Sequence, residues 1–508
     1  MSQESRVRKS LLNARVNLIF YFLTLALSFF SRKIFLDTLG ADFVGLTGTL
    51  QNLLGFLNLA ELGIGSAIGY VLYKPLFDHD ETKINEIISV FGYLYRWIGK
   101  IILIAGCILA CFLPLIFPNT EFDLGLIFFA YFSFLASSLI GYFANYKQTL
   151  LGADQKNYVV TAYFQTATII KTIIQMALAY YTGNYYLWVI VELSFGIIYS
   201  FILNWKINQV YPWLRSEVSQ GRILFKKYPE VMKYTKQLFV HKFTTFIQFQ
   251  TTPFLIYAFV SLQTVAFYGN YTIITDKLSV FIGNLLGSTG VGNLIAEGDR
   301  NKIMKVFWEL LAIRFWFASI FIFALYFLLE PFIILWLGKQ YILNKSILII
   351  LLCNVFIMQT RGVTDQFLYG YGLFRDVWAP IAEAVIYLVV ALIAGSCLGL
   401  KGVLLGGIIS MLIIVCGWKP VFLFKSGFHF PLYIYWFNWG KHLFLMFITF
   451  IIGDYVVALI TIDPAENYWE WIKYAMCITS IFVLMYTSVL SLFSQGMRSF
   501  LQRILRIK

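Results

Sequence analysis

The stretch LGADFVGLTGTLQNLLGFLNLAELGIGSAIGYVLYKPLFDHDETKI, residues 39–84, returns in weaker form as VSLQTVAFYGNYTIITDKLSVFIGNLLGSTGVGNLIAEGDRNKI, residues 260–303. Both copies lie within long apolar surroundings, so we interpret them as equivalent parts of a duplicated helical bundle in a membrane. Two similar lobes that rock against each other can expose a site between them to either side in turn. The aligned residues are Gly48 with Gly269, Asp80 with Asp299, Lys83 with Lys302 and Ile84 with Ile303.

The composition is that of an all-α polytopic membrane protein. Hydrophobic residues make up 59% of the 508-residue chain and charged residues 13%, whereas ~25% of an average soluble domain is charged. The six cysteines include no CxxC pair and lie in or beside apolar stretches, so we interpret them as small buried side chains. The sequence contains no P-loop, nucleophile elbow or metal-ligand cluster, so we expect no enzyme activity, metal or cofactor.

A membrane span needs ~20 apolar residues, with a range of about 17–25 before tilt. By this criterion the sequence predicts fourteen transmembrane helices. They are placed at 15–36, 43–73, 87–117, 122–150, 157–182, 184–208, 237–260, 264–292, 303–328, 341–369, 376–397, 402–424, 438–461 and 470–493.

The basic residues predict the orientation. Of the 39 Lys and Arg residues, six lie on one side, three lie deep within spans and the other 30 lie on the opposite side. That side is cytoplasmic by the positive-inside rule, and an even number of spans puts both termini there. Topology thus explains most of the +13 net charge and leaves no basic soluble face for nucleic acid. The six are Arg32, Lys33, Lys339, Lys345, Lys401 and Lys473, and the three are Lys171, Lys277 and Arg314.

The spans predict four parts of the chain. Residues 1–208 form an N-lobe, 209–236 a cytoplasmic linker, 237–424 a C-lobe, and 425–508 two extra spans with a basic tail. The linker is basic and aromatic. We interpret it as an amphipathic segment on the inner leaflet, and a surface for a protein partner is the alternative.

The segment FVGLTGTLQNLLGFLNLAELGIGSAIGYVLYKPLFDHDETKINEII, residues 43–88, resembles the second span and following loop of the polysaccharide exporters. These Wzx-type O-antigen and capsule flippases share a superfamily (MOP) with the multidrug extruders (MATE) and the lipid II flippases. The resemblance covers nearly the whole chain: fourteen spans, two related six-span lobes and two extra C-terminal spans. It implies that the substrate is an undecaprenyl-diphosphate-linked oligosaccharide, moved from the cytoplasmic to the outer leaflet of the bacterial inner membrane.

Such a substrate sets the chemistry to look for. Its headgroup cannot cross ~30 Å of hydrocarbon unaided, so the protein needs a wet cavity with cations for the diphosphate and amides or aromatic rings for the sugars. No bond is broken, and a proton or sodium gradient can drive the transport. We expect a monomer that contacts membrane lipid and the polysaccharide polymerase machinery.

Charges inside spans are the first candidates, because they usually face a bundle interior or a water-filled cavity. Arg314 lies mid-span, and Arg96 holds the matching place in the first lobe. A guanidinium suits a phosphate bidentately. The alternatives are an inter-helix ion pair or, for Arg96, snorkelling to the interface.

Lys171 lies at the centre of its span and is either a cavity cation or the partner of a carboxylate such as Glu192. Asp276 and Lys277 are adjacent and point about 100° apart on a helix. Each is a candidate for substrate contact, and Asp276 also for binding a coupling ion.

Arg361 and Asp365 are spaced i, i+4 on one helical face, so we predict that they neutralise each other. Glu61 and Glu383 are isolated acids within spans and are candidates for carrying a coupling proton or sodium ion.

Polar amides form the last group of candidates. They can bind sugar hydroxyls, but each can equally hold two helices together. The amides predicted to line the cavity are Gln51, Asn52, Gln248 and Asn270.

Three functions remain open. The first is the polysaccharide flippase, and the second is another exporter of the same superfamily, either a lipid II flippase or a drug and ion antiporter. The first predicted span has no acid before Asp37, which disfavours a cation extruder. The third is a membrane glycosyl or acyl transferase, which the short outer loops disfavour.

Overall fold

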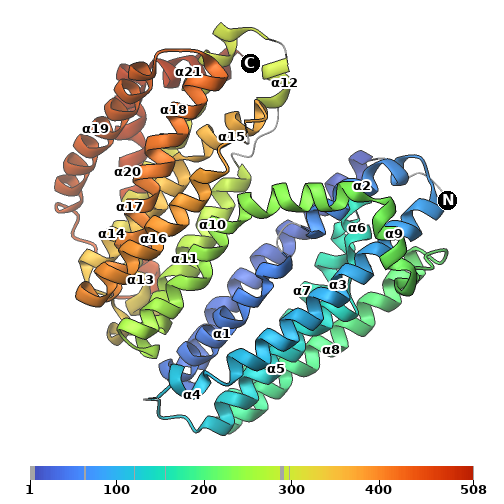
Figure 1. Cartoon of the computed structure of the whole chain (residues 1–508). Helices are drawn as coiled ribbons and strands as arrows, with labels where there is room; N and C mark the ends of the chain where they lie inside the picture. Colours follow the sequence, from blue (N-terminus) through green and yellow to red (C-terminus); the bar gives the residue numbers. More distant parts are fainter. Residues whose placement is uncertain are drawn as a thin grey trace. The chain divides into compact units, whose positions relative to one another are not determined.

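The computed structural model describes residues 6–61, 64–118, 120–154, 156–285, 291–296, 298–373 and 375–506. Every regular element among them is a helix. Contacts divide the chain into two compact units, Met1–Ala266 and Phe267–Lys508, which are described one at a time below (Figure 1).

The first unit is a bundle of long helices. Its elements are α1 (Arg6–Leu57), η1 (Asn58–Glu61), α2 (Ile64–Phe77), α3 (Glu81–Ala110), α4 (Leu113–Ile116), α5 (Leu124–Phe143), α6 (Gln148–Ala153), α7 (Asn157–Thr182), α8 (Tyr185–Val210), η2 (Val218–Gln220), α9 (Gly221–Lys227), α10 (Pro229–Phe259) and the first turn of α11 (Leu262–Leu285). Within it α3 packs on α5, α5 on α8, α8 on α7 and α7 on α1.

The second unit holds the rest of α11 and the remaining helices. They are α12 (Val291–Ala296), α13 (Arg300–Trp336), η3 (Lys339–Tyr341), α14 (Lys345–Thr360), α15 (Gly362–Gly370), α16 (Trp378–Leu398), α17 (Leu400–Met411), η4 (Leu412–Trp418), α18 (Lys419–Leu423), η5 (Phe424–Phe428), α19 (Leu432–Val457), α20 (Tyr468–Phe493) and α21 (Gln495–Arg506). Helix α13 is its centre and contacts α14, α19, α20 and α21. Aromatic rings fill this core, and Phe323 stacks on Phe482 with ring centroids 3.9 Å apart.

Ten of the described helices are long and apolar enough to cross a membrane, which confirms a multi-pass membrane protein. One of them, Arg15–Leu57, contains the predicted span 15–36 and the first part of 43–73, and its two halves meet at Gly40 with φ 83°. Only glycine adopts such a φ readily. The rest of 43–73 that the structure describes falls in η1 and α2, so this predicted span is not one continuous helix. The predicted spans 157–182, 237–260 and 264–292 correspond to α7, α10 and α11, which are not among the ten. Helical structure therefore lies at each of the fourteen predicted positions, although 43–73 and 341–369 are divided and residues 286–290 of the predicted span 264–292 lie outside the described residues.

The sequence repeat is visible in how two helices begin. The Asp80 carboxylate accepts the Lys83 backbone N–H at the start of α3, and Asp299 accepts those of Asn301 and Lys302 at the start of α13. Such caps satisfy backbone donors that have no partner within the helix. The hydrogen bond from the Lys83 backbone N–H, helped by the Lys83 side chain, lowers the pKa of Asp80 and keeps this cap charged.

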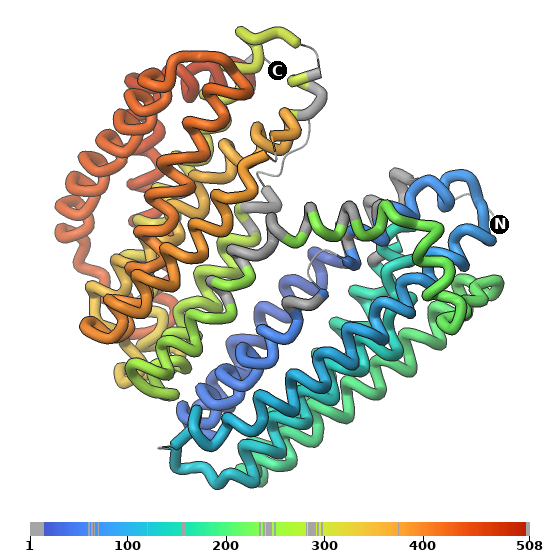
Figure 2. The backbone as a smooth tube through the Cα atoms, viewed as in Figure 1, coloured from blue at the N-terminus to red at the C-terminus, as the bar shows by residue number. Residues whose placement is uncertain are grey.

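The linker lies against α3 (Figure 2). The Arg215 backbone N–H donates to Asn85 Oδ1 at 2.7 Å, and Lys227 Nζ pairs with Glu86 Oε2 at 2.7 Å. This docking leaves Ile223 exposed, as a membrane contact or a partner contact requires. The sequence predicts that the C-lobe begins at residue 237, within the following helix, α10. In the structure, however, α10 contacts α1 and α2 of the first unit.

Candidate functional site

Among the residues that the structure describes, charges inside the spans gather at a broken helix of the second unit. The predicted span 341–369 divides into α14 and α15 at Arg361, which ends one helix and starts the next. The residue after the break is Gly362, and a Cβ there would come within 2.6 Å of Arg314 Nη1. Glycine at this position therefore makes room for the Arg314 guanidinium.

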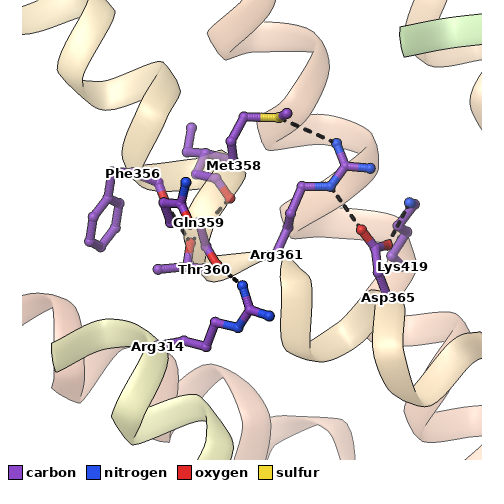
Figure 3. A network of polar contacts seen from close by, with 9 residues as sticks. Arg314, Phe356, Met358, Gln359, Thr360, Arg361, Asp365 and Lys419 are labelled. Carbon is purple, nitrogen blue, oxygen red and sulfur yellow. Dashed lines mark hydrogen bonds and ion pairs between the residues drawn. The ribbon is translucent and has the colours of Figure 1, made fainter. Parts of the chain in front are cut away.

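Two cations share one carboxylate at the start of α15 (Figure 3). Arg361 Nε donates to Asp365 Oδ2 at 2.9 Å, and Lys419 Nζ donates to Asp365 Oδ1 at 2.8 Å. The predicted pairing of Arg361 with Asp365 is confirmed, and Lys419 is a further partner that the sequence analysis missed. All three side chains are less than one fifth exposed.

Lys419 is positioned by an irregular stretch of helix. It begins α18, which lies between two π-helical segments, Leu412–Trp418 and Phe424–Phe428. Segments with π-helical hydrogen bonding are rare and often occur at functional sites, because the extra residue per turn redirects side chains. A basic residue inside the predicted span 402–424 was the sequence signal for Lys419.

Arg314 and Glu383 complete the cluster. Arg314 is buried in α13, and its Nη1 donates to the Gln359 carbonyl oxygen at 3.4 Å. This carbonyl belongs to the last turn of α14, where a cation satisfies a free acceptor and complements the helix dipole. Glu383, buried in α16, interacts electrostatically with Arg361. The cluster thus holds three cations and two carboxylates.

In the first unit Lys171 pairs with Glu192. Lys171 Nζ lies 2.7 Å from Glu192 Oε1, and Gln175 Nε2 donates to Glu192 Oε2 at 3.0 Å. Of the two interpretations of Lys171, the structure therefore shows the inter-helix pair, between α7 and α8.

Glu61 ends the short helix η1 and accepts hydrogen bonds from two phenols. Tyr142 Oη donates to Glu61 Oε2 at 2.6 Å, and Tyr95 Oη donates to Oε1. Asn58 Oδ1 lies 2.9 Å from the Tyr142 hydroxyl. Within the described part of the chain no cation forms an ion pair with Glu61, so neutral donors hold this carboxylate. The two tyrosines were not predicted.

The other predicted residues differ in how far they are buried. Asp276 is exposed on α11, Lys277 is half-buried and Asn270 is buried. In the first unit Arg96 is exposed although its counterpart Arg314 is buried, so the repeat does not give the two arginines equal surroundings.

The amides differ in how they are used. Gln51 is exposed, whereas Asn52 Nδ2 donates to the Gly48 carbonyl of its own helix at 2.7 Å. The side chain of Gln248 lies outside the described residues. Among those described, no group of three His, Cys, Asp or Glu side chains could hold a metal ion.

Comparisons with known proteins place the fold. No family model matches the sequence, and no curated protein matches it. Among solved structures, the lipid II flippase MurJ in an inward closed conformation gives a TM-score of 0.64 at 15% identity, over 93% of this chain and 98% of that chain. An inward-facing MATE multidrug transporter of the MOP superfamily gives 0.59 at 15% identity, over 82% of this chain and 99% of that one. These likenesses confirm the expected MATE/MOP-like fold.

Proposed function

We propose that this chain is a flippase that moves an undecaprenyl-diphosphate-linked oligosaccharide, of the kind used for O-antigen or capsule, from the cytoplasmic to the outer leaflet. The proposed location is the bacterial cytoplasmic membrane, with both termini in the cytoplasm. Transport of this kind breaks no bond and needs only a polar path for the headgroup while the lipid tail stays in the bilayer.

The charge cluster of the second unit carries this proposal. Arg314, Arg361 and Lys419 bring three positive charges against the two negative charges of Asp365 and Glu383. Cations inside a membrane bundle are costly unless a carboxylate, another anion or water compensates them. A diphosphate is a suitable anion, because a guanidinium can bind it bidentately and an ammonium as a point charge.

Arg361 and Lys419 are the better candidates for direct contact with the headgroup. The side chains of both are more exposed, at 18% and 15%, and pair with a carboxylate, whereas Arg314 is 7% exposed and bonds a backbone carbonyl. We assign Arg314 the role of holding the break between α14 and α15 in place.

The likeness to MurJ supports a lipid-linked substrate and keeps lipid II itself as the second candidate. The MurJ match covers 93% of this chain. The part left uncovered is shorter than the segment formed by α19–α21, so the match extends into the helices that follow the two lobes. The MATE match covers less of the chain, which favours a lipid flippase over a drug extruder.

Coupling to an ion gradient is part of the proposal. Glu383 interacts electrostatically with Arg361, a cation that partly compensates its charge. Glu61, held by neutral phenols, and the exposed Asp276 are therefore the better candidates to bind and release a proton or sodium ion.

Depletion of the protein in its host tests the choice of substrate. We expect a lipid-linked oligosaccharide to accumulate and surface polysaccharide to fall, with both effects reversed by the wild-type gene. Accumulation of lipid II would instead assign the second candidate. Increased drug sensitivity with normal lipid-linked intermediates would refute both.

A further inference from the structure

We propose that an open cavity of about 400 Å³ at the surface of the first unit, between α2, α6 and α7, binds a sugar unit of the lipid-linked glycan as it enters from the cytoplasm. This proposal rests on the proposed function and assigns part of the headgroup a site of its own, separate from the charge cluster. The lining residues are Gly69, Tyr73, Gln148, Thr149, Gly152, Ala153 and Val160.

The size and lining suit a sugar. Pockets that bind small molecules usually enclose about 300–1,000 Å³ and combine an aromatic surface with a few polar groups. Here the exposed ring of Tyr73 supplies the aromatic surface, and Gln148 and Thr149 supply an amide and a hydroxyl. Neither of these two side chains bonds to another described residue, so their hydrogen-bonding capacity is available to a ligand.

Two glycines keep the cavity open. A Cβ placed on Gly69 or on Gly152 would meet nothing within 4 Å. A side chain at either position would therefore occupy the cavity without disturbing the protein around it. Bare backbone of this kind lets a ligand approach closely.

The wall formed by α6 is held rigidly at both ends. Before it, Asn145 Oδ1 accepts hydrogen bonds from Ser200 Oγ at 2.7 Å and from Asn204 Nδ2 at 3.0 Å. After it, Asp154 accepts the Tyr211 hydroxyl at 2.8 Å and pairs with Lys156. A wall fixed in this way costs a ligand little ordering entropy on binding.

The charges nearby fit an anionic substrate. Lys74 directly follows Tyr73, and Lys147 directly precedes Gln148. Both belong to the side that the basic residues predict to be cytoplasmic. Basic residues next in sequence to the lining are compatible with a substrate that carries a diphosphate or an acidic substituent.

Protection of a cysteine tests binding directly. Gly152→Cys, made after replacing the six native cysteines, is alkylated with a maleimide in detergent, with and without free glycan released by mild acid from the host's lipid-linked pool. At a glycan concentration four times Kd, alkylation should slow about fivefold by mass action. The matched control is Gly440→Cys on α19, which also has open space around its Cβ and does not line the cavity; its rate should not change.

Three results would overturn the proposal. One is equal rates with and without glycan, another is a cavity cysteine that never reacts, and the third is protection by glycerophosphate but not by glycan, which would indicate a phospholipid headgroup.

Filling the cavity tests its part in transport. Gly152→Trp should lower export per inserted molecule about tenfold, a barrier change of ~1.4 kcal/mol, while Gly440→Trp should leave export unchanged. Equal export by the two variants would remove the cavity from the transport path. If the wild type exports no lipid-linked glycan, the proposed function fails, and the protection experiment alone then decides whether the cavity binds sugar.

Discussion

At the scale of single residues, one carboxylate organises the charge cluster. Asp365 is shared by Arg361 and Lys419, so loss of either cation leaves Asp365 paired with the other, whereas loss of the acid leaves two cations facing each other. We therefore expect Asp365 to be needed for stability, and Arg361 and Lys419 to be needed for transport.

Arg361→Ala should therefore abolish function without unfolding the protein. Lys419 still neutralises Asp365 in this variant. Loss of a charge-assisted contact with the substrate costs on the order of 1.5–3 kcal/mol, or about 10- to 150-fold in affinity. The measurement is glycan export divided by the amount of membrane-inserted protein. Arg361→Lys should keep part of the export, and unchanged normalised export in Arg361→Ala would remove Arg361 from the site.

Asp365→Asn should instead lower stability. Removing one partner of a buried ion pair costs ~3–5 kcal/mol, because the remaining charges stay desolvated. The thermal unfolding temperature of the purified protein in detergent measures this effect. Glu470→Gln, which breaks the more exposed pair with Lys473, is the control and should change the free energy of unfolding by about 1 kcal/mol or less. Equal unfolding temperatures for the two variants would contradict the central place of Asp365.

At the scale of helices, close approach at glycine holds the second unit together. Helices α16 and α17 meet so tightly that a Cβ at Gly402 would overlap the Ala394 carbonyl. In a membrane, small residues of this kind let two helices gain packing energy that the lipid does not supply.

Gly402→Ala should force these helices apart and lower the unfolding temperature, since overpacking typically costs ~1–3 kcal/mol. Gly440→Ala is the matched control. Nothing lies within 4 Å of its Cβ, and alanine is intrinsically the better helix former, so this variant should be neutral or slightly more stable. A Gly402→Ala protein as stable as this control would contradict the packing assigned to α16 and α17.

The sequence predicted the helices well because their signals are local. Gly40 separates two apolar runs. Asp80 and Asp299 each cap the start of a helix, and in both cases a Lys-Ile pair begins three residues later. The break at Arg361 was not predicted, because it contains no proline, and the mostly polar residues 359–366, with Gly362, also suit the end of a single span. The π-helical turns beside Lys419 depend on packing and have no sequence signature.

The site was predicted in part for the same reason. Arg361 and Asp365 lie four residues apart on one helix, so their pairing could be predicted from spacing, whereas the third partner, Lys419, comes from another helix. Arg96 and Arg314 occupy equivalent positions in the repeat. Arg314, however, donates a hydrogen bond to the Gln359 carbonyl oxygen beside a helix break, whereas Arg96 is exposed. The sequence repeat therefore predicts where each arginine lies along its helix, but it does not predict which residues surround it.

At the scale of the whole molecule, the distribution of basic residues predicts which side faces the cytoplasm. Two exposed positions test it after removal of the native cysteines: Tyr181 at the end of α7, 82% exposed, and Ile223 in the linker, 76% exposed. In spheroplasts, an impermeant thiol reagent should label Tyr181→Cys, and it should label Ile223→Cys only after permeabilisation. The opposite pattern would invert the topology and the proposed direction of transport.

The central claim is that the protein by itself carries a lipid-linked glycan across a bilayer. The most direct measurement uses the purified protein in proteoliposomes loaded with lipid-linked glycan from host membranes depleted of this protein. An impermeant glycosidase or periodate then reports the fraction of glycan in the outer leaflet. We predict that the wild-type protein, with a proton or sodium gradient imposed, makes the protected pool accessible within minutes, whereas Arg361→Ala and empty liposomes do not. An accessible fraction equal to that of empty liposomes under every imposed gradient would contradict the claim.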